Sequence, residues 1–88
     1  MKDEYYMDIL KESGAILSGH FLLTSGLHSA TYVEKFKILQ FPLLCDKLCK
    51  GIADNFMKAS PNVVLGAATG GIIISHSVGR ILSSRSIF

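Results

Sequence analysis

Residues 63–71 read VVLGAATGG, and this stretch decides the fold that the sequence predicts. VVLG at 63–66 is a short, wholly apolar run, which is typical of a strand buried on both faces of a parallel sheet. Gly66 permits a sharp turn, and Gly70 and Gly71 let the backbone approach a ligand closely before a helix begins. N–H groups left free at the start of that helix, with the helix dipole behind them, suit an anion such as phosphate or pyrophosphate.

Two other interpretations of this stretch stay open. It is neither a Walker A motif nor a G-x-G-x-x-G fingerprint, so a plain strand–helix turn without a ligand also fits it. Residues 62–79 are uncharged and contain Gly66 and Gly70 in GxxxG spacing, which fits a membrane-spanning helix. We favour the strand, loop and helix, because Thr69 and His76 would be polar groups within a membrane span.

The segments before this stretch predict one helix and two strands. Acidic residues open a helix over 3–13, and Gly14 stands at its C-terminal end. β-Branched and aromatic residues predict strands over 20–24 and 29–35, joined by the turn SGLH.

A second helix is predicted from Pro42, over 43–58, because an apolar stripe recurs there every four residues. This stripe, which has to pack on a neighbour, consists of Leu44, Leu48, Ile52 and Phe56, with Cys45, Cys49 and Ala53 beside it. After the strand at 63–66, residues 72–84 predict a helix whose apolar side holds Ile74, Val78, Ile81 and Leu82. RSIF at 85–88 resembles the opening of another strand, and strand, glycine loop, helix and strand form a βαβ unit of an α/β fold.

The composition predicts a piece of a larger core. A chain of 88 residues forms one small domain that buries only roughly 60–65% of its unfolded surface. Yet 49% of the residues are hydrophobic and only 18% are charged. We therefore expect the chain either to hide apolar surface against a partner or to belong to a larger core.

Charge and cysteine usage argue against several classes of function. The net charge is +2 and the nine basic residues are scattered, so we expect no nucleic-acid partner. On a helix, Cys45 and Cys49 would hold their Cβ atoms about 5–6 Å apart, too far for a disulfide. Two free thiols, no metal-ligand spacing and no signal peptide predict a protein of the reducing cytoplasm.

The turn TSGLHS at 24–29 is the second segment with chemistry. It combines hydroxyl groups, His28 and backbone donors near Gly26, which fits either contact with an anion or a polar hairpin tip without function. We expect His20 and His76 to be structural or solvated. No adjacent Ser/His/Asp set and no carboxylate pair in a loop occur, and the adjacent Asp3 and Glu4 stand at the start of the first helix, so we predict no catalytic residue within this chain.

Taken together, GHFLLTSGLHSATYV at 19–33 and VVLGAATGGIIIS at 63–75 resemble the N-terminal half of the orotate phosphoribosyltransferases, which are type I phosphoribosyltransferases. The resemblance covers nearly all of residues 3–88. It implies an incomplete α/β fold: part of a Rossmann-like parallel sheet flanked by helices, with an N-terminal helix and short strands forming a hood. It divides a single partial domain, 1–88, into the helix and hood strands at 1–40 and the first helix–strand–helix of the core at 41–88.

The resemblance implies a pentosyltransferase of pyrimidine biosynthesis. Such an enzyme transfers ribose 5-phosphate from phosphoribosyl pyrophosphate (PRPP), with Mg²⁺, to orotate, giving orotidine monophosphate and pyrophosphate. An oxocarbenium-like transition state would need positioning and charge stabilisation more than a nucleophile. The implied partners are these two small substrates and a second copy of the chain, or the missing C-terminal half, with neither nucleic acid nor membrane.

The resemblance also implies site residues. The orotate-contacting segment would be Thr31, Tyr32 and Val33. The residues near pyrophosphate would be Thr24, Ser25 and Gly26 in the turn, with Ala68, Thr69, Gly70 and Gly71 in the glycine loop. A non-proline cis peptide of this family would fall between Ala68 and Thr69. Many relatives carry Lys where Thr24 stands, and some carry Lys where Gly70 stands.

Two features of the family do not occur in this sequence. They are the PRPP fingerprint, in which two adjacent acidic residues precede a Thr/Ser-Gly-Gly loop, and a mobile loop rich in Lys and Arg, which would begin after RSIF. The magnesium ligands would lie mostly outside the chain. The resemblance therefore implies a truncated enzyme that is inactive alone. Another phosphoribosyltransferase, a regulator with this fold and a non-catalytic dimerisation module remain alternatives.

Overall fold

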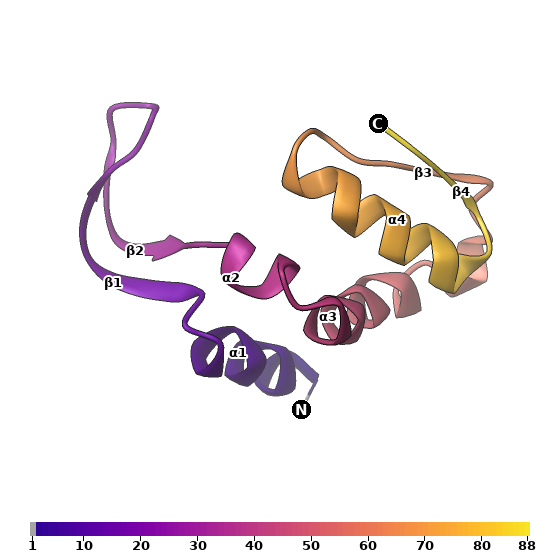
Figure 1. The fold of residues 1–88 in the computed structure, drawn as a ribbon, viewed down its shortest axis with the longest axis horizontal. Coiled ribbons are helices and arrows are strands. Elements are labelled where there is room, and N and C mark those ends of the chain that lie inside the picture. Colours follow the sequence, from indigo (N-terminus) through magenta and orange to yellow (C-terminus); the bar gives the residue numbers. More distant parts are fainter. Residues whose placement is uncertain (1) are drawn as a thin grey trace.

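A computed structural model describes residues 2–88 of the protein, which form four α-helices, one 3-10 turn and four strands (Figure 1). The described residues form one antiparallel pair of strands and one parallel pair. In chain order the elements are α1 (Lys2–Glu12), β1 (Ile16–Leu22), β2 (His28–Val33), α2 (Phe36–Leu39), α3 (Pro42–Asp54), a 3-10 turn (Met57–Ala59), β3 (Val63–Leu65), α4 (Gly70–Leu82) and β4 (Arg85–Ile87).

The hairpin of β1 and β2 stands away from the helices at one side of the molecule (Figure 1). A hairpin was predicted, but its first strand was expected at 20–24, whereas β1 begins at Ile16 and ends at Leu22. The register shifts between Ser18 and Phe21, so a bulge interrupts the alternation of side chains in the middle of β1. This interruption explains why the sequence pattern revealed only the second part of the strand.

The core lies where α3 meets α4. Cys45, Cys49 and Ala53 of α3 are buried together with Val78 of α4. Small side chains on α3 allow a close approach, and the Cys49 Sγ lies 3.9 Å from the Ile74 carbonyl oxygen. An exposed ion pair, Arg80 to Asp46 at 2.8 Å, also joins the two helices and adds little stability.

The apolar stripe predicted for α3 is therefore not the centre of its buried face. Leu44 and Leu48 are half-buried, whereas Ile52 and Phe56 are exposed, and Phe56 lies beyond the end of the helix. The residues predicted to stand beside the stripe form its buried centre instead. The predicted apolar side of α4 is confirmed, because Val78 is buried and Ile74, Ile81 and Leu82 pack against the core.

β3 and β4 pair in parallel, with Val63 opposite Arg85 and Leu65 opposite Ile87, and α4 connects them. The predicted βαβ unit is thus confirmed. The expectation that the first strand is buried on both faces is wrong for this chain, because Leu65 is 73% exposed. Within residues 2–88, β4 is the only strand that pairs with β3.

The chain leaves β3 through a loop and does not continue as a helix, which excludes the membrane-span interpretation of residues 62–79. α4 begins only at Gly70 and has 13 residues. No helix in the described part of the chain has the length and apolarity needed to cross a membrane.

A single helical turn, α2, was not predicted. It has four residues, and its Ile38 and Leu39 are buried, so it closes the core between the hairpin and α3. A segment this short contains no repeat of the 3.6-residue period, so sequence periodicity could not have revealed it.

The glycine loop between β3 and α4 closes on itself. A Cβ atom added to Gly66 would collide with the carbonyl oxygen of Gly71 and lie 2.7 Å from the Ser75 Oγ. The Gly66 N–H donates to the Ile87 carbonyl oxygen at 2.9 Å, which ties the same residue to β4. Only glycine fits at position 66 without moving backbone.

We predict that Gly66→Ala lowers the free energy of unfolding by about 1–3 kcal/mol, the usual cost of overpacking a tight contact. Gly71→Ala is the matched control, because its added Cβ would lie 3.4 Å from the nearest atom, an ordinary contact. Urea unfolding of the two variants measures the difference. Equal stability of the two alanine variants would contradict the closed loop.

We also predict a pH-dependent stability from Cys49. Burial, and then the neighbouring Cys45, raise the pKa of the Cys49 thiol from 9.0 to about 12. The folded chain therefore binds this proton more tightly than the unfolded chain. Its contribution to stability is complete below about pH 9 and is lost towards about pH 12, by at most about 1.4 kcal/mol per pH unit.

Urea unfolding between about pH 8 and about pH 10.5 checks this slope in the wild type and in Cys49→Ala. The variant leaves a cavity, so the comparison uses the pH slopes and not the absolute stabilities. The slope should be shallower in the variant, and identical slopes would refute the assignment.

Candidate functional site

The glycine loop presents unpaired backbone donors at the start of α4. Within the described residues, no hydrogen bond leads from the N–H groups of Ala68, Thr69, Gly70 or Gly71 to another protein group. The Thr69 side chain makes no capping bond to the helix either. Ala68 and Thr69 are exposed, so an anion could accept hydrogen bonds from their N–H groups in the field of the 13-residue helix. The peptide bond between Ala68 and Thr69 is cis, as the resemblance predicted.

The tip of the hairpin is a closed turn. The Gly26 N–H donates to the Leu23 carbonyl oxygen at 2.9 Å, and the Leu27 N–H donates to the Ser25 Oγ at 3.4 Å. The N–H groups of Gly26 and Leu27 are therefore used within the turn, whereas those of Thr24 and Ser25 donate to no protein group among the described residues. The tip also offers the exposed side chains of Thr24 and Ser25.

The segment predicted to contact orotate lies on β2. Tyr32 is 41% exposed, and its ring centroid lies 5.6 Å from that of Phe21 on β1, with an angle of 32° between the ring planes. Ser29 uses both backbone hydrogen-bonding groups of Thr31. The Ser29 Oγ donates to the Thr31 carbonyl oxygen at 2.6 Å and accepts from the Thr31 N–H at 3.1 Å. The exposed Tyr32 ring, supported by Phe21, could stack on a flat ligand.

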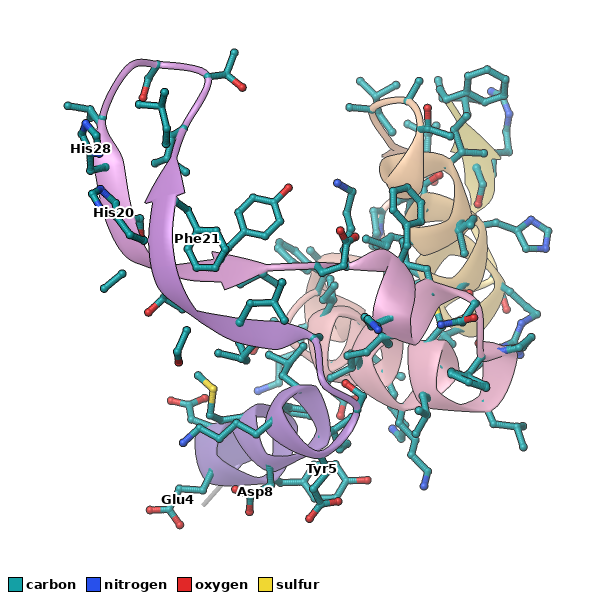
Figure 2. The ribbon with its side chains drawn as sticks, turned by 60° about the vertical axis from the view of Figure 1, so that its left-hand side comes forward. Glu4, Tyr5, Asp8, His20, Phe21 and His28 are labelled. Carbon is teal, nitrogen blue, oxygen red and sulfur yellow. The ribbon has the colours of Figure 1, made fainter. Side chains whose placement is uncertain are left out.

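Phe21 was not predicted as part of this surface. Figure 2 shows its ring on the side of the hairpin that faces the rest of the molecule. In the register Phe21 lies opposite Ser29 and Tyr32 lies opposite Leu17, so the pairing of β1 with β2 does not by itself predict that the two rings meet. The bulge near Ser18 hides this pairing in the sequence.

A histidine pair occupies the outer side of the hairpin (Figure 2). The His20 Nε2 lies 2.6 Å from the His28 Nδ1, and both rings are exposed. We had expected His20 to be structural or solvated. The signal that could have revealed the pair is the register, since His28 faces Leu22, two residues after His20. One of these two nitrogens donates the hydrogen bond and the other accepts it.

The two segments predicted to meet one pyrophosphate are not brought together by the chain. The hairpin tip and the glycine loop lie on the same side of the molecule, and the loop is at the end of α4 that is nearer the hairpin (Figure 1). Among residues 2–88, no hydrogen bond or ion pair joins Thr24, Ser25 or Gly26 to the loop at 68–71.

The described residues do not fit a magnesium site. Mg²⁺ prefers several oxygen ligands in octahedral geometry. The part of the chain that the structure describes contains no group of three or more His, Cys, Asp and Glu side chains that could hold a metal ion.

Comparison with known proteins places the chain beside one enzyme family. No family model matches the sequence. The chain is 42% identical over all 88 residues to an orotate phosphoribosyltransferase of Caldicellulosiruptor saccharolyticus and 44% identical to one of Desulforamulus reducens. It covers 46% of each of these two proteins. The chain thus spans about half the length of the curated relatives it matches.

Solved structures agree with this similarity. The orotate phosphoribosyltransferase of Aeropyrum pernix matches 92% of the chain with a TM-score of 0.71 at 26% identity, and the chain covers 50% of it. The UMP synthase of Leishmania donovani matches 93% of the chain with a TM-score of 0.85, and the chain covers 18% of it. At 16% identity that second match establishes the fold alone. By sequence and by fold, this chain is similar along its whole length to about half of an orotate phosphoribosyltransferase.

Proposed function

We propose that this chain supplies the orotate-contacting and pyrophosphate-contacting parts of an orotate phosphoribosyltransferase. The observation that carries the proposal is the 42% identity to such an enzyme over all 88 residues. In the reaction, the ribose C1 loses its bond to pyrophosphate, which leaves with the electron pair. C1 then gains a bond to N1 of orotate, whose proton is released, and the product is orotidine monophosphate of pyrimidine biosynthesis.

The glycine loop is the proposed contact for pyrophosphate. Ala68, Thr69, Gly70 and Gly71 carry N–H groups that no protein acceptor uses. Donors fixed before the reaction stabilise the charge that develops on a leaving pyrophosphate without reorganising. The Thr24 and Ser25 hydroxyls and the Gly26 turn form the second proposed contact, which would have to approach the ligand from the other end of the site.

The face of β2 is the proposed contact for orotate. Tyr32 offers a half-exposed ring, and Thr31 and Val33 flank it along the strand. The flat, electron-poor ring of orotate would stack on Tyr32. No residue of this chain is proposed to act as nucleophile, acid or base. Its contribution would be positioning.

Magnesium enters the proposal only as a companion of PRPP, whose phosphate oxygens are suitable ligands. Residues 2–88 do not supply a protein site for it, and no step above depends on one. A homodimer, or association with the rest of the enzyme, and a location in the cytoplasm are likewise proposed from the similarity. Neither nucleic acid nor membrane is proposed as a partner.

We predict that residues 1–88 bind orotate but do not convert it, because they contain no acidic pair followed by a Thr/Ser-Gly-Gly loop to hold the ribose hydroxyls and 5-phosphate of PRPP. Calorimetry with orotate, with uracil and hypoxanthine as controls, tests binding. Loss of orotate absorbance in the presence of PRPP and Mg²⁺ tests turnover. Preferred binding of hypoxanthine would point to another phosphoribosyltransferase, and no binding of any base or of pyrophosphate would favour a non-catalytic module.

We further predict that Tyr32→Ala weakens orotate binding by about tenfold, as expected for a stacking contact of about 1–1.5 kcal/mol. Tyr5→Ala is the matched control, since Tyr5 is an exposed tyrosine on α1, away from the hairpin. Calorimetry on the two variants measures the difference. If both variants bind orotate like the wild type, Tyr32 is not the stacking surface.

A further inference from the structure

The side chain of Lys35 lies on the glycine loop. Lys35 connects β2 to α2, and Gly70 is the first residue of α4. A Cβ atom added to Gly70 would lie 2.7 Å from the Lys35 Cε and 3.0 Å from its Cδ. The aliphatic part of Lys35 therefore occupies the space in which a side chain at position 70 would begin. Gly70 is buried as a result, whereas Lys35 itself stays exposed.

No carboxylate among residues 2–88 forms an ion pair with the Lys35 ammonium group. The ion pairs found within residues 2–88 are Lys50 with Asp54 and Arg80 with Asp46. The adjacent Glu34 accepts a hydrogen bond from the Phe36 N–H at 3.3 Å through its Oε1, at the start of α2. The Lys35 Nζ lies 5.0 Å from the centroid of the Phe36 ring, a contact that holds the ammonium group without neutralising it.

We propose that Lys35 is a pyrophosphate-binding residue of this site and that position 70 is glycine to leave room for its side chain. This inference rests on the proposed function, and it adds a residue that neither sequence motif contains. The loop offers backbone N–H groups, which carry only partial charge. Lys35 brings a full positive charge to the same place from a different element of the chain.

The chemistry of lysine suits this role. Its ammonium group is a mobile point charge with three donors on a flexible stem, so it can reach different oxygens of a phosphate ligand as the ligand moves. The stem rests on Gly70 and leaves the charged end in solvent, as long basic side chains commonly do. Because no protein carboxylate has to be released first, binding an anion costs no broken ion pair.

The first test compares Lys35→Met with Lys37→Met, an exposed lysine on α2 outside the proposed site. Calorimetry on the complete chain uses inorganic pyrophosphate and, separately, orotate. Lys35→Met should bind pyrophosphate about tenfold more weakly, the scale of one charge-assisted hydrogen bond, and should bind orotate like the wild type. Lys35→Arg should retain most of the pyrophosphate affinity, and its dependence on salt should exceed that of Lys35→Met. Lys37→Met should bind both ligands like the wild type.

A second variant keeps the lysine but displaces it. Gly70→Ala adds a Cβ where the Lys35 stem lies, and a flexible stem can move aside at little cost in stability. Pyrophosphate binding should weaken in Gly70→Ala. It should weaken no further when Gly70→Ala is added to Lys35→Met, because the two changes remove the same interaction. Thermal unfolding of each variant confirms that it is folded.

The outcomes separate this inference from the proposed function. If the wild type binds orotate and pyrophosphate but Lys35→Met binds pyrophosphate equally well, the role of Lys35 is refuted and the proposed function stands. If Gly70→Ala and Lys35→Met weaken binding additively, the link between the two residues is refuted. If the wild type binds neither ligand, both the proposed function and this inference are wrong.

Discussion

The fold of the C-terminal part depends on one contact, that between the backbones of Gly66 and Gly71. Because the two ends of the loop touch, the chain reverses direction over four residues and α4 begins beside the strand that it has just left. α4 can then cover β3 and return the chain so that β4 pairs in parallel. The same reversal leaves the N–H groups of residues 68–71 without protein partners. One steric constraint thus determines both the architecture and the donors of the proposed site.

Much of this could be predicted because the signals are local. An apolar run, glycines at 66, 70 and 71 and an apolar helix face are contiguous in the sequence, and each corresponds to one element of the βαβ unit. The start of α3 at Pro42 also follows from a single residue. The hairpin was only partly predictable, because the bulge between Ser18 and Phe21 breaks the alternation on which strand prediction depends.

The features that could not be predicted are contacts between residues that are separated in the sequence. The contact of Lys35 with Gly70 spans 35 residues, and no periodicity links the two. The histidine pair and the contact of Phe21 with Tyr32 require the strand register, which the turn and the bulge set together. Which side of α3 is buried depends on the neighbour that it packs against. Cys45, Cys49 and Ala53 are buried in the cluster that includes Val78 of α4, and the larger leucines of α3 are not fully buried. Tertiary packing decided each of these cases.

The parallel pair of β3 and β4 has a consequence for handling the isolated chain. Within residues 2–88 these strands pair only with each other, so each has an outer edge of backbone groups that no neighbouring strand satisfies. Apolar side chains accompany these edges, since Leu65 and Phe88 are 73% and 78% exposed. Unprotected edges of this kind are templates for strand addition. Concentrated solutions of residues 1–88 will therefore tend to oligomerise through β-sheet extension and to precipitate, unless a further strand covers each edge.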